Sequence, residues 1–191
     1  MGVNAMEGLA QRLTRSFLRR GIITADQTEW CAYILECKLD QWFAFAIMAV
    51  VGTVLAGLPK TLLFLCGVGF LRRRTNGYHA NTYLECLVKS LGCEVVCLLA
   101  APLLPVWACA LLLAAGTVTV VLLAPVNNQN LHFDEREMAA LRQSTRKRLA
   151  VADLAAVLLL AAVPEYAAYL VLALCVVAVL LLLAKLGFGM Q

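Results

Sequence analysis

Six stretches of mostly apolar residues alternate with shorter polar stretches along this chain. They cover residues 41–58, 59–71, 87–104, 106–124, 149–163 and 165–184. A helix that crosses a bilayer needs about 20 residues, with a range of about 17–25, so the segments 59–71 and 149–163 are short. Both either extend into flanking residues or form partial spans buried among other helices. The pattern predicts an all-α, polytopic membrane protein with about six transmembrane helices.

Residues 4–20 follow a different pattern, in which apolar and basic positions separate onto two faces of a helix. The apolar face holds Met6, Leu9, Leu13, Phe17 and Leu18. The arginines lie mostly on the other face, as in an amphipathic interfacial helix on anionic lipid. A solvated helix packed on the rest of the protein is the alternative. Gly21 is expected to end this helix, and Thr24 or Asp26 can cap a second short helix running towards Lys38.

Composition supports the membrane prediction. Of the 191 residues, 62% are hydrophobic and 15% are charged, against about 45–50% and about 25% in an ordinary soluble domain. A soluble globule of this length lacks the interior to bury so much apolar surface. We therefore expect a single membrane domain over residues 1–191. Its parts would be interfacial helices (1–40), the first two spans (41–71), a cytoplasmic catalytic loop and helix start (72–86), spans three and four (87–124), a cytoplasmic loop (125–148), and the last two spans with the tail (149–191).

Basic residues predict the orientation of these spans. With six spans, both termini lie on one side, together with the 72–86 and 125–148 loops. These regions hold 14 of the 16 lysines and arginines, and only Lys60 and Lys89 lie elsewhere. By the positive-inside rule, we expect both termini and both loops to face the cytoplasm.

Eight cysteines are scattered along the chain, mostly within apolar runs, where cysteine behaves as a small hydrophobe. Their scatter does not resemble the disulfide framework of a secreted protein. Cys93 and Cys97 share a helix face, but their neighbourhood lacks the further ligands that a zinc site needs. We expect no metal, no cofactor and no nucleic-acid partner; membrane lipid is the expected surrounding.

One polar stretch that begins after the second apolar segment carries the strongest candidate chemistry. Positive-inside anchoring explains Arg72, Arg73 and Arg74, which could also hold an acidic stretch of a substrate. Anchoring does not explain His79, one of only two histidines, seven residues before Cys86. An imidazole beside a thiol is the pair that a cysteine peptidase uses as base and nucleophile. A cysteine that is merely buried is the alternative.

Helix geometry restricts how this pair could meet. On one straight helix His79 and Cys86 would lie about 10.5 Å apart, whereas proton transfer needs about 2.6–3.2 Å. Thr82 and Glu85 fit a capping box, which predicts that a helix begins near Thr82 with Cys86 in its first turns. Gly77 can adopt positive φ and let the preceding loop fold back, so that His79 reaches Cys86 from outside the helix. The helix start and the imidazole would favour the thiolate, making Cys86 the nucleophile and His79 the general base and later acid.

A second polar stretch, residues 124–132, contains several amides and the other histidine. The amides, including those of Asn127 and Asn130, could hydrogen-bond a peptide backbone. A turn leading into a cytoplasmic amphipathic segment is the alternative. His132 is interpreted as an exposed loop residue.

The two polar stretches together resemble the motif of accessory gene regulator B proteins, which are integral membrane cysteine endopeptidases of bacterial peptide quorum sensing. Their signature is an arginine, a Gly-Gly-Tyr-His-Ala-like run, and a cysteine seven residues past the histidine. Arg72, Gly77, His79 and Cys86 match by position, while Asn76 replaces the first glycine. Asparagine also visits left-handed conformations.

The second stretch looks like the Ala-Pro loop of the same family. Ala124 and Pro125 are followed by Asn130, without the family's usual Asn-Lys-Pro run. Length, six hydrophobic segments and a basic amphipathic start also agree, so the likeness covers nearly the whole chain.

The resemblance implies a reaction and a partner. The substrate would be a small precursor peptide with an amphipathic helix, a cysteine-bearing core and an acidic tail. Cys86 would attack the core–tail junction and form an acyl thioester, which the core cysteine would convert into a thiolactone. The resemblance also implies a homodimer in a bacterial cell membrane.

Two other classes of function stay open. One is a peptide transporter or export component in which the polar loop lines a passage, although no span carries a clear run of ionisable residues. The other is a non-enzymatic membrane scaffold or receptor, in which Cys86 would be inert. Thiol labelling over a pH range separates a buried cysteine from one activated by an imidazole.

Overall fold

A computed structural model describes residues 3–75, 82–126 and 134–188, with side chains from residue 6 onward. Across these ranges the chain forms α-helices and two short 3₁₀ helices, and no strand. The elements are α1 (Val3–Arg19), η1 (Ala25–Gln27), α2 (Thr28–Ala56), α3 (Leu58–Thr75), α4 (Tyr83–Ala100), η2 (Ala101–Leu103), α5 (Val106–Leu123), α6 (Glu135–Ala162) and α7 (Pro164–Lys185). The predicted all-α fold is confirmed.

The chain divides into two compact units, Met1–Met48 and Ala49–Gln191. The first unit contains α1, whose exposed Leu9 and buried Ala10 and Thr14 belong to the predicted amphipathic helix. Gly21 follows α1 with a φ of 68°, and its N–H donates to the carbonyl of Leu18 at 3.0 Å. Glycine adopts this left-handed conformation without steric cost. The prediction that Gly21 ends the first helix is confirmed.

The predicted separation between a short helix ending near Lys38 and a first span beginning at residue 41 is wrong. One continuous helix, α2, runs from Thr28 to Ala56. Between residues 28 and 51 there is no glycine or proline, so the change from polar to apolar composition leaves the backbone hydrogen bonds uninterrupted.

Four helices within the described residues are long and apolar enough to cross a membrane: Ala25–Ala56, Tyr83–Leu103, Val106–Leu123 and Pro164–Lys185. The chain is a polytopic membrane protein. The predicted spans 59–71 and 149–163 fall in α3 and α6, which are not in this set. Lys60 and three arginines lie within the 18 residues of α3, and only the second half of α6 is apolar. These are the same two segments that were short for a bilayer in the sequence.

Most of the expected 125–148 loop belongs to α6. Asp134 caps this helix: its carboxylate accepts from the N–H of Glu137 at 2.7 Å, and its own N–H donates to the Glu137 carboxylate at 3.1 Å. This reciprocal pair satisfies backbone N–H groups at the helix start. The polar residues 135–148 are therefore the first half of a helix, which the boundary at residue 149 missed.

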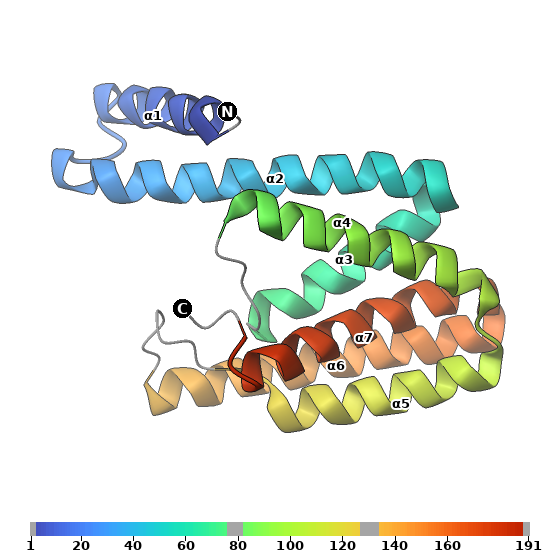
Figure 1. Cartoon of the computed structure of the whole chain (residues 1–191). Helices are drawn as coiled ribbons and strands as arrows, with labels where there is room; N and C mark the ends of the chain where they lie inside the picture. The colour runs from blue at the N-terminus through green and yellow to red at the C-terminus, as the bar shows by residue number, and fades with distance from the viewer. Residues whose placement is uncertain (1–2, 76–81, 127–133, 189–191) are drawn as a thin grey trace. The chain divides into compact units, whose positions relative to one another are not determined.

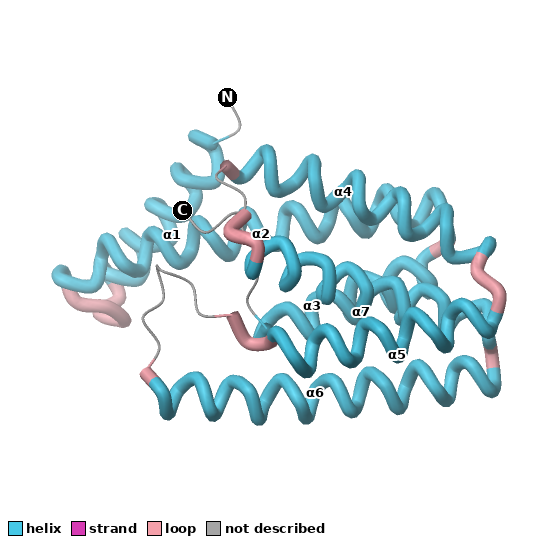
Figure 2. The backbone as a smooth tube through the Cα atoms, turned by 60° about the horizontal axis from the view of Figure 1, so that its bottom comes forward, coloured by secondary structure: helices cyan, strands magenta, loops and turns pink. Residues whose placement is uncertain are grey.

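Within Ala49–Gln191, α7 is the most buried helix and packs against α3, α5 and α6 (Figures 1 and 2). Small residues allow this close approach. A Cβ on Gly67 of α3 would lie 3.0 Å from the Cβ of Ala173, and one on Gly116 of α5 would lie 3.1 Å from Cγ of Leu174. Helices associate in membranes mainly through such tight packing, because burial from lipid provides little hydrophobic driving force.

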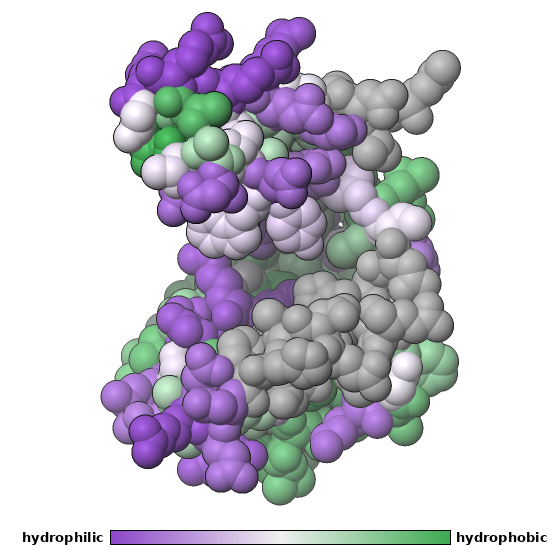
Figure 3. Space-filling model, turned by 90° about the vertical axis from the view of Figure 1, so that its left-hand side faces the viewer, coloured by the Kyte–Doolittle hydropathy of each residue, from purple (hydrophilic) through white to green (hydrophobic). Residues whose placement is uncertain are grey.

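This unit has two ends with different chemistry. At the Cys86 end, α3 and α5 finish and α4 and α6 begin; at the Lys60 end, short turns join α2 to α3, α4 to α5 and α6 to α7 (Figure 1). Figure 3 faces the Cys86 end, where hydrophilic residues cover much of the described surface in the lower part of the view.

Candidate functional site

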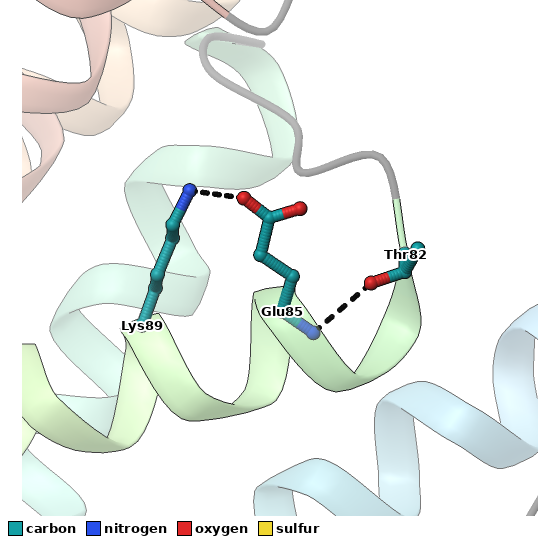
Figure 4. Close-up of polar contacts among 3 residues, drawn as sticks. All are labelled: Thr82, Glu85 and Lys89. Atoms are coloured by element: carbon teal, nitrogen blue, oxygen red, sulfur yellow. Dashed lines mark hydrogen bonds and ion pairs between the residues drawn. The ribbon is translucent and has the colours of Figure 1, made fainter.

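Cys86 lies in the first turn of α4. Thr82 precedes the helix in an extended conformation, and its hydroxyl oxygen accepts from the N–H of Glu85 at 3.2 Å (Figure 4). The N–H of Cys86 donates to the carbonyl of Thr82 at 3.0 Å. The prediction that the helix begins near Thr82 is confirmed, and the local sequence alone supports it, because threonine is a favoured N-cap residue.

Glu85 also forms an ion pair with Lys89, one turn further along α4 (Figure 4). A glutamate four residues before a lysine is the favoured orientation for such a pair on a helix. Glu85 therefore contributes its N–H to the Thr82 cap and its carboxylate to the pair with Lys89, and the reciprocal half of the predicted capping box stays a prediction.

The surroundings of Cys86 combine an accessible thiol with nearby positive charge. The side chain is exposed, and the N-terminal turn of a helix carries partial positive charge. Arg72, at the end of α3, interacts electrostatically with Cys86: burial lowers the pKa of the Arg72 guanidinium, and the negative charge of the Cys86 thiolate opposes that lowering. A cation and a helix start beside an accessible thiol are the environment in which cysteines become nucleophilic.

The three predicted arginines occupy the last turn of α3 in unequal surroundings. Arg72 is half-buried, whereas Arg73 and Arg74 are exposed. Thr75, which ends the helix, is fully buried. Arg73 and Arg74 are thus available to an acidic group, while Arg72 is the one that interacts electrostatically with Cys86.

Residues far away in sequence hold this end of α3 in place. The hydroxyl of Thr145 donates to the carbonyl of Arg74 at 3.0 Å, and a guanidinium N–H of Arg148 donates to the carbonyl of Phe70 at 2.6 Å. The Arg148 guanidinium also lies 5.0 Å from the centroid of the Phe70 ring. The carbonyl of Arg74 is among the last four of α3, which lack intrahelical partners, and Thr145 supplies one. Arg148 gives a further donor to the carbonyl of Phe70, one turn earlier.

The start of the second polar stretch, residues 124–126, contacts the same end of α3. Ala124, Pro125 and Val126 are buried, and the N–H of Val126 donates to the carbonyl of Thr75 at 3.2 Å. Two segments that the sequence indicated separately, 72–75 and 124–126, are therefore brought together at the end of α3.

Sequence reasoning missed Thr145, Arg148 and Lys89 as parts of this site. In the sequence, Arg148 entered only the count of basic residues that predicted the orientation, and Lys89 was noted only for its position at the edge of a span. The signal for Lys89 was its spacing from Glu85. No local signal relates Arg148 to Phe70, because 78 residues separate them.

Four predicted site residues lie outside the described residues: Gly77, His79, Asn127 and Asn130. The histidine–cysteine pair therefore stays a prediction. All eight cysteines are free thiols. Within 3–75, 82–126 and 134–188, no group of three histidine, cysteine or acidic residues could hold a metal ion.

Comparison with known proteins identifies the family. The family model described as Accessory gene regulator B matches residues 7–185. No curated protein and no solved structure matches the chain. The matched range includes every described element of the Cys86 end and nearly all of the sequence. The chain belongs to the accessory gene regulator B family.

Proposed function

We propose that this chain is a membrane-embedded cysteine endopeptidase that processes a precursor peptide for quorum sensing. Membership of the accessory gene regulator B family supports a role in quorum-sensing peptide processing. The observation that carries the finer proposal is the exposed thiol of Cys86 in the first turn of α4, beside Arg72. An accessible thiol with a cation and a helix start beside it can be held as a nucleophilic thiolate.

In the proposed first step, the Cys86 thiolate attacks the carbonyl at the junction between the core and the tail of the precursor. A C–S bond forms and the C–N bond breaks, leaving an acyl thioester on Cys86. The departing amine of the tail takes a proton from His79, which acts as the general acid. Arg73 and Arg74, exposed at the end of α3, attract the acidic tail.

In the second step, a cysteine in the core gives its proton to His79 and attacks the thioester. A new thioester closes the ring as a thiolactone, and the Cys86 thiolate is released. Exchange between two thioesters is nearly balanced in free energy, so the intermediate must be protected from water, and a membrane-embedded site does this. Holding the core beside Cys86 raises the effective concentration of its thiol.

Other parts of the proposal concern the loops and the assembly. Gly77, Asn127 and Asn130 would position the backbone of the substrate, and α1 would lie beside the amphipathic helix of the precursor in the interface. We further propose that the chain works as a homodimer in a bacterial cell membrane, with the Cys86 end in the cytoplasm.

Co-expression with the precursor and mass spectrometry of the products test the proposal. The variants Cys86→Ala and His79→Ala should each abolish cleavage while the protein still inserts in the membrane. Cys66→Ala removes another exposed cysteine and serves as the matched control, with cleavage unchanged. Cleavage that persists in Cys86→Ala would rule the proposal out. Peptide export that survives the same substitution would favour a transporter instead.

A further inference from the structure

A groove of about 540 Å³ lies between α4 and α7, next to the candidate site. The side contributed by α4 holds Lys89, Cys93 and Cys97, and the side contributed by α7 includes Val176, Leu180 and Leu183. Both helices belong to the Ala49–Gln191 unit. Apart from Lys89, this lining is apolar or a thiol, so the groove suits apolar side chains.

The groove continues the helix face that carries Cys86. Lys89, Cys93 and Cys97 follow Cys86 by three, seven and eleven residues, a spacing that keeps residues on one side of an α-helix. Seven residues return to the same direction within about 20°. Lys89 links the two places, because it lines the groove and also pairs with Glu85, the residue before Cys86.

Charge changes sharply at Cys86. Arg72, at the end of α3, interacts electrostatically with Cys86. The groove, which includes Lys89 one turn further along α4, presents aliphatic residues and thiols. An acidic segment of a bound chain would favour the arginines, and an apolar segment would favour the groove.

We infer that this groove binds the apolar residues of the precursor that immediately precede the scissile bond. The inference rests on the proposed function, which places the scissile carbonyl at Cys86 and the acidic tail at the arginines. An apolar groove disfavours the acidic tail, so the residues before the carbonyl are the part of the precursor that fits the groove along α4. Cys86 and Cys93 are separated by about 10.5 Å of helical rise, a length that about three extended residues cover.

The occupant that competes with the peptide is a lipid acyl chain, which would also fit an apolar groove. Two observations favour the peptide. The groove lies on the same face of α4 as the exposed thiol of Cys86, and its lining includes the cationic Lys89. A peptide with apolar residues next to an acidic tail complements both the groove and the neighbouring cations.

Native cysteines allow a direct test of position. The precursor is given one cysteine, three residues before the scissile bond, with serine in place of its own, and is combined with the Cys86→Ala protein in membranes. Oxidation with copper–phenanthroline should form a disulfide to Cys93. This product should disappear when Cys93→Ala is added and persist when Cys66→Ala is added. Cross-linking spread over all cysteines, or a lipid retained in the groove with no cross-link to Cys93, would overturn the inference.

A groove-filling variant gives an independent kinetic test. Val176→Trp should raise the KM for the precursor by about tenfold with kcat nearly unchanged, because it removes binding without touching the reacting atoms. Val157→Trp, on the exposed surface of α6, is the matched control and should leave KM unchanged. Normal KM in Val176→Trp contradicts the groove assignment even where Cys86 is essential. Cleavage that persists in Cys86→Ala contradicts the proposed function itself, so the two failures are distinguishable.

Discussion

The two ends of the helix bundle in Ala49–Gln191 are held together by different kinds of contact. At the Cys86 end, besides the local contacts at the starts of α4 and α6, three hydrogen bonds join segments far apart in the chain: Val126 donates to Thr75, Thr145 to Arg74 and Arg148 to Phe70. The third of these spans 78 residues. The arrangement of this end therefore depends on several helices taking up their places together.

At the Lys60 end, short turns supply most of the connections. Gly57 joins α2 to α3 with a φ of 85°, the N–H of Leu104 donates to the carbonyl of Ala101 at 3.3 Å, and the N–H of Val163 donates to the carbonyl of Leu159 at 2.7 Å. The Lys60 ammonium lies 5.6 Å from the ring centroid of Tyr166, on α7. These turns are local in sequence and close the hairpins directly.

Close packing rather than polar contact marks the region next to this end. Gly52 of α2 faces Thr61 and Glu94. Glu94 is fully buried, and neither of its carboxylate oxygens has a hydrogen-bond partner among the described residues. The comparison suggests a division: substitutions near the Lys60 end should act mainly on stability, and substitutions at the Cys86 end mainly on the reactivity of the thiol.

The largest effect is expected from Gly52→Val. A Cβ at Gly52 would lie 2.4 Å from Cγ2 of Thr61 and 2.7 Å from a carboxylate oxygen of Glu94. Overpacking of this kind costs about 3 kcal/mol of unfolding free energy, measurable by denaturation in detergent. Alkylation of Cys86 in the surviving folded fraction should keep its normal rate. Gly69→Val, where a Cβ would meet nothing within 4 Å, is the control; equal losses in both would show that helix propensity, not packing, is responsible.

Arg148→Met should act at the Cys86 end and, unlike Gly52→Val, should change the reactivity of Cys86. It removes the N–H that donates to Phe70 and the guanidinium above that ring. Losing a hydrogen bond from a charged group costs about 2 kcal/mol, and the displaced end of α3 should slow both precursor cleavage and Cys86 alkylation. Arg146→Met alters an exposed arginine of the same helix and should behave as the unaltered protein. Normal alkylation in Arg148→Met would mean that the site does not depend on this contact.

Glu94→Met should stabilise the protein. A buried carboxyl group with unpaired oxygens costs about 1–3 kcal/mol relative to an apolar group of similar size. The expected gain is about 1.5 kcal/mol, seen as a higher unfolding temperature in detergent. Glu94→Gln, which keeps two polar atoms, should show no comparable gain. A loss of cleavage in Glu94→Met without a loss of stability would assign the carboxyl a role in function and weaken the division between the two ends.

The smallest effect is expected from Thr82→Ala, which removes the hydroxyl that accepts from Glu85. Loss of an N-cap costs about 1 kcal/mol, and fraying of the first turn of α4 should slow Cys86 alkylation at neutral pH. Thr82→Ser keeps the hydroxyl and should restore the rate. An unchanged rate in Thr82→Ala would show that the loop before α4, rather than the cap, fixes the position of Cys86.

The errors in the sequence-based helix boundaries have a common cause. Composition changes near residues 40 and 149, but α2 and α6 continue through both positions. Hydropathy reports which part of a helix contacts lipid, whereas a helix ends where a residue such as Gly21 interrupts its hydrogen bonds. The sequence therefore showed where α2 and α6 change from polar to apolar surroundings, but neither helix ends at that point.

The sequence by itself determined the features that depend on neighbouring residues. The apolar runs predicted a helical membrane protein, and Thr82 predicted where α4 begins and that Cys86 lies in its first turn. Such features follow from helix periodicity and capping, which act within a few residues of chain. The motif of Arg72, Gly77, His79 and Cys86 also indicated the family from the sequence alone.

Only the tertiary structure decided what surrounds Cys86. The contacts of Arg148 with Phe70 and of Val126 with Thr75, and the groove between α4 and α7, join residues about 50 to 100 positions apart along the chain. A single backbone carbonyl or aliphatic side chain carries no mark of its distant partner in the sequence. Its partner is set by how the helices pack, because close-packed helices bring only certain faces together.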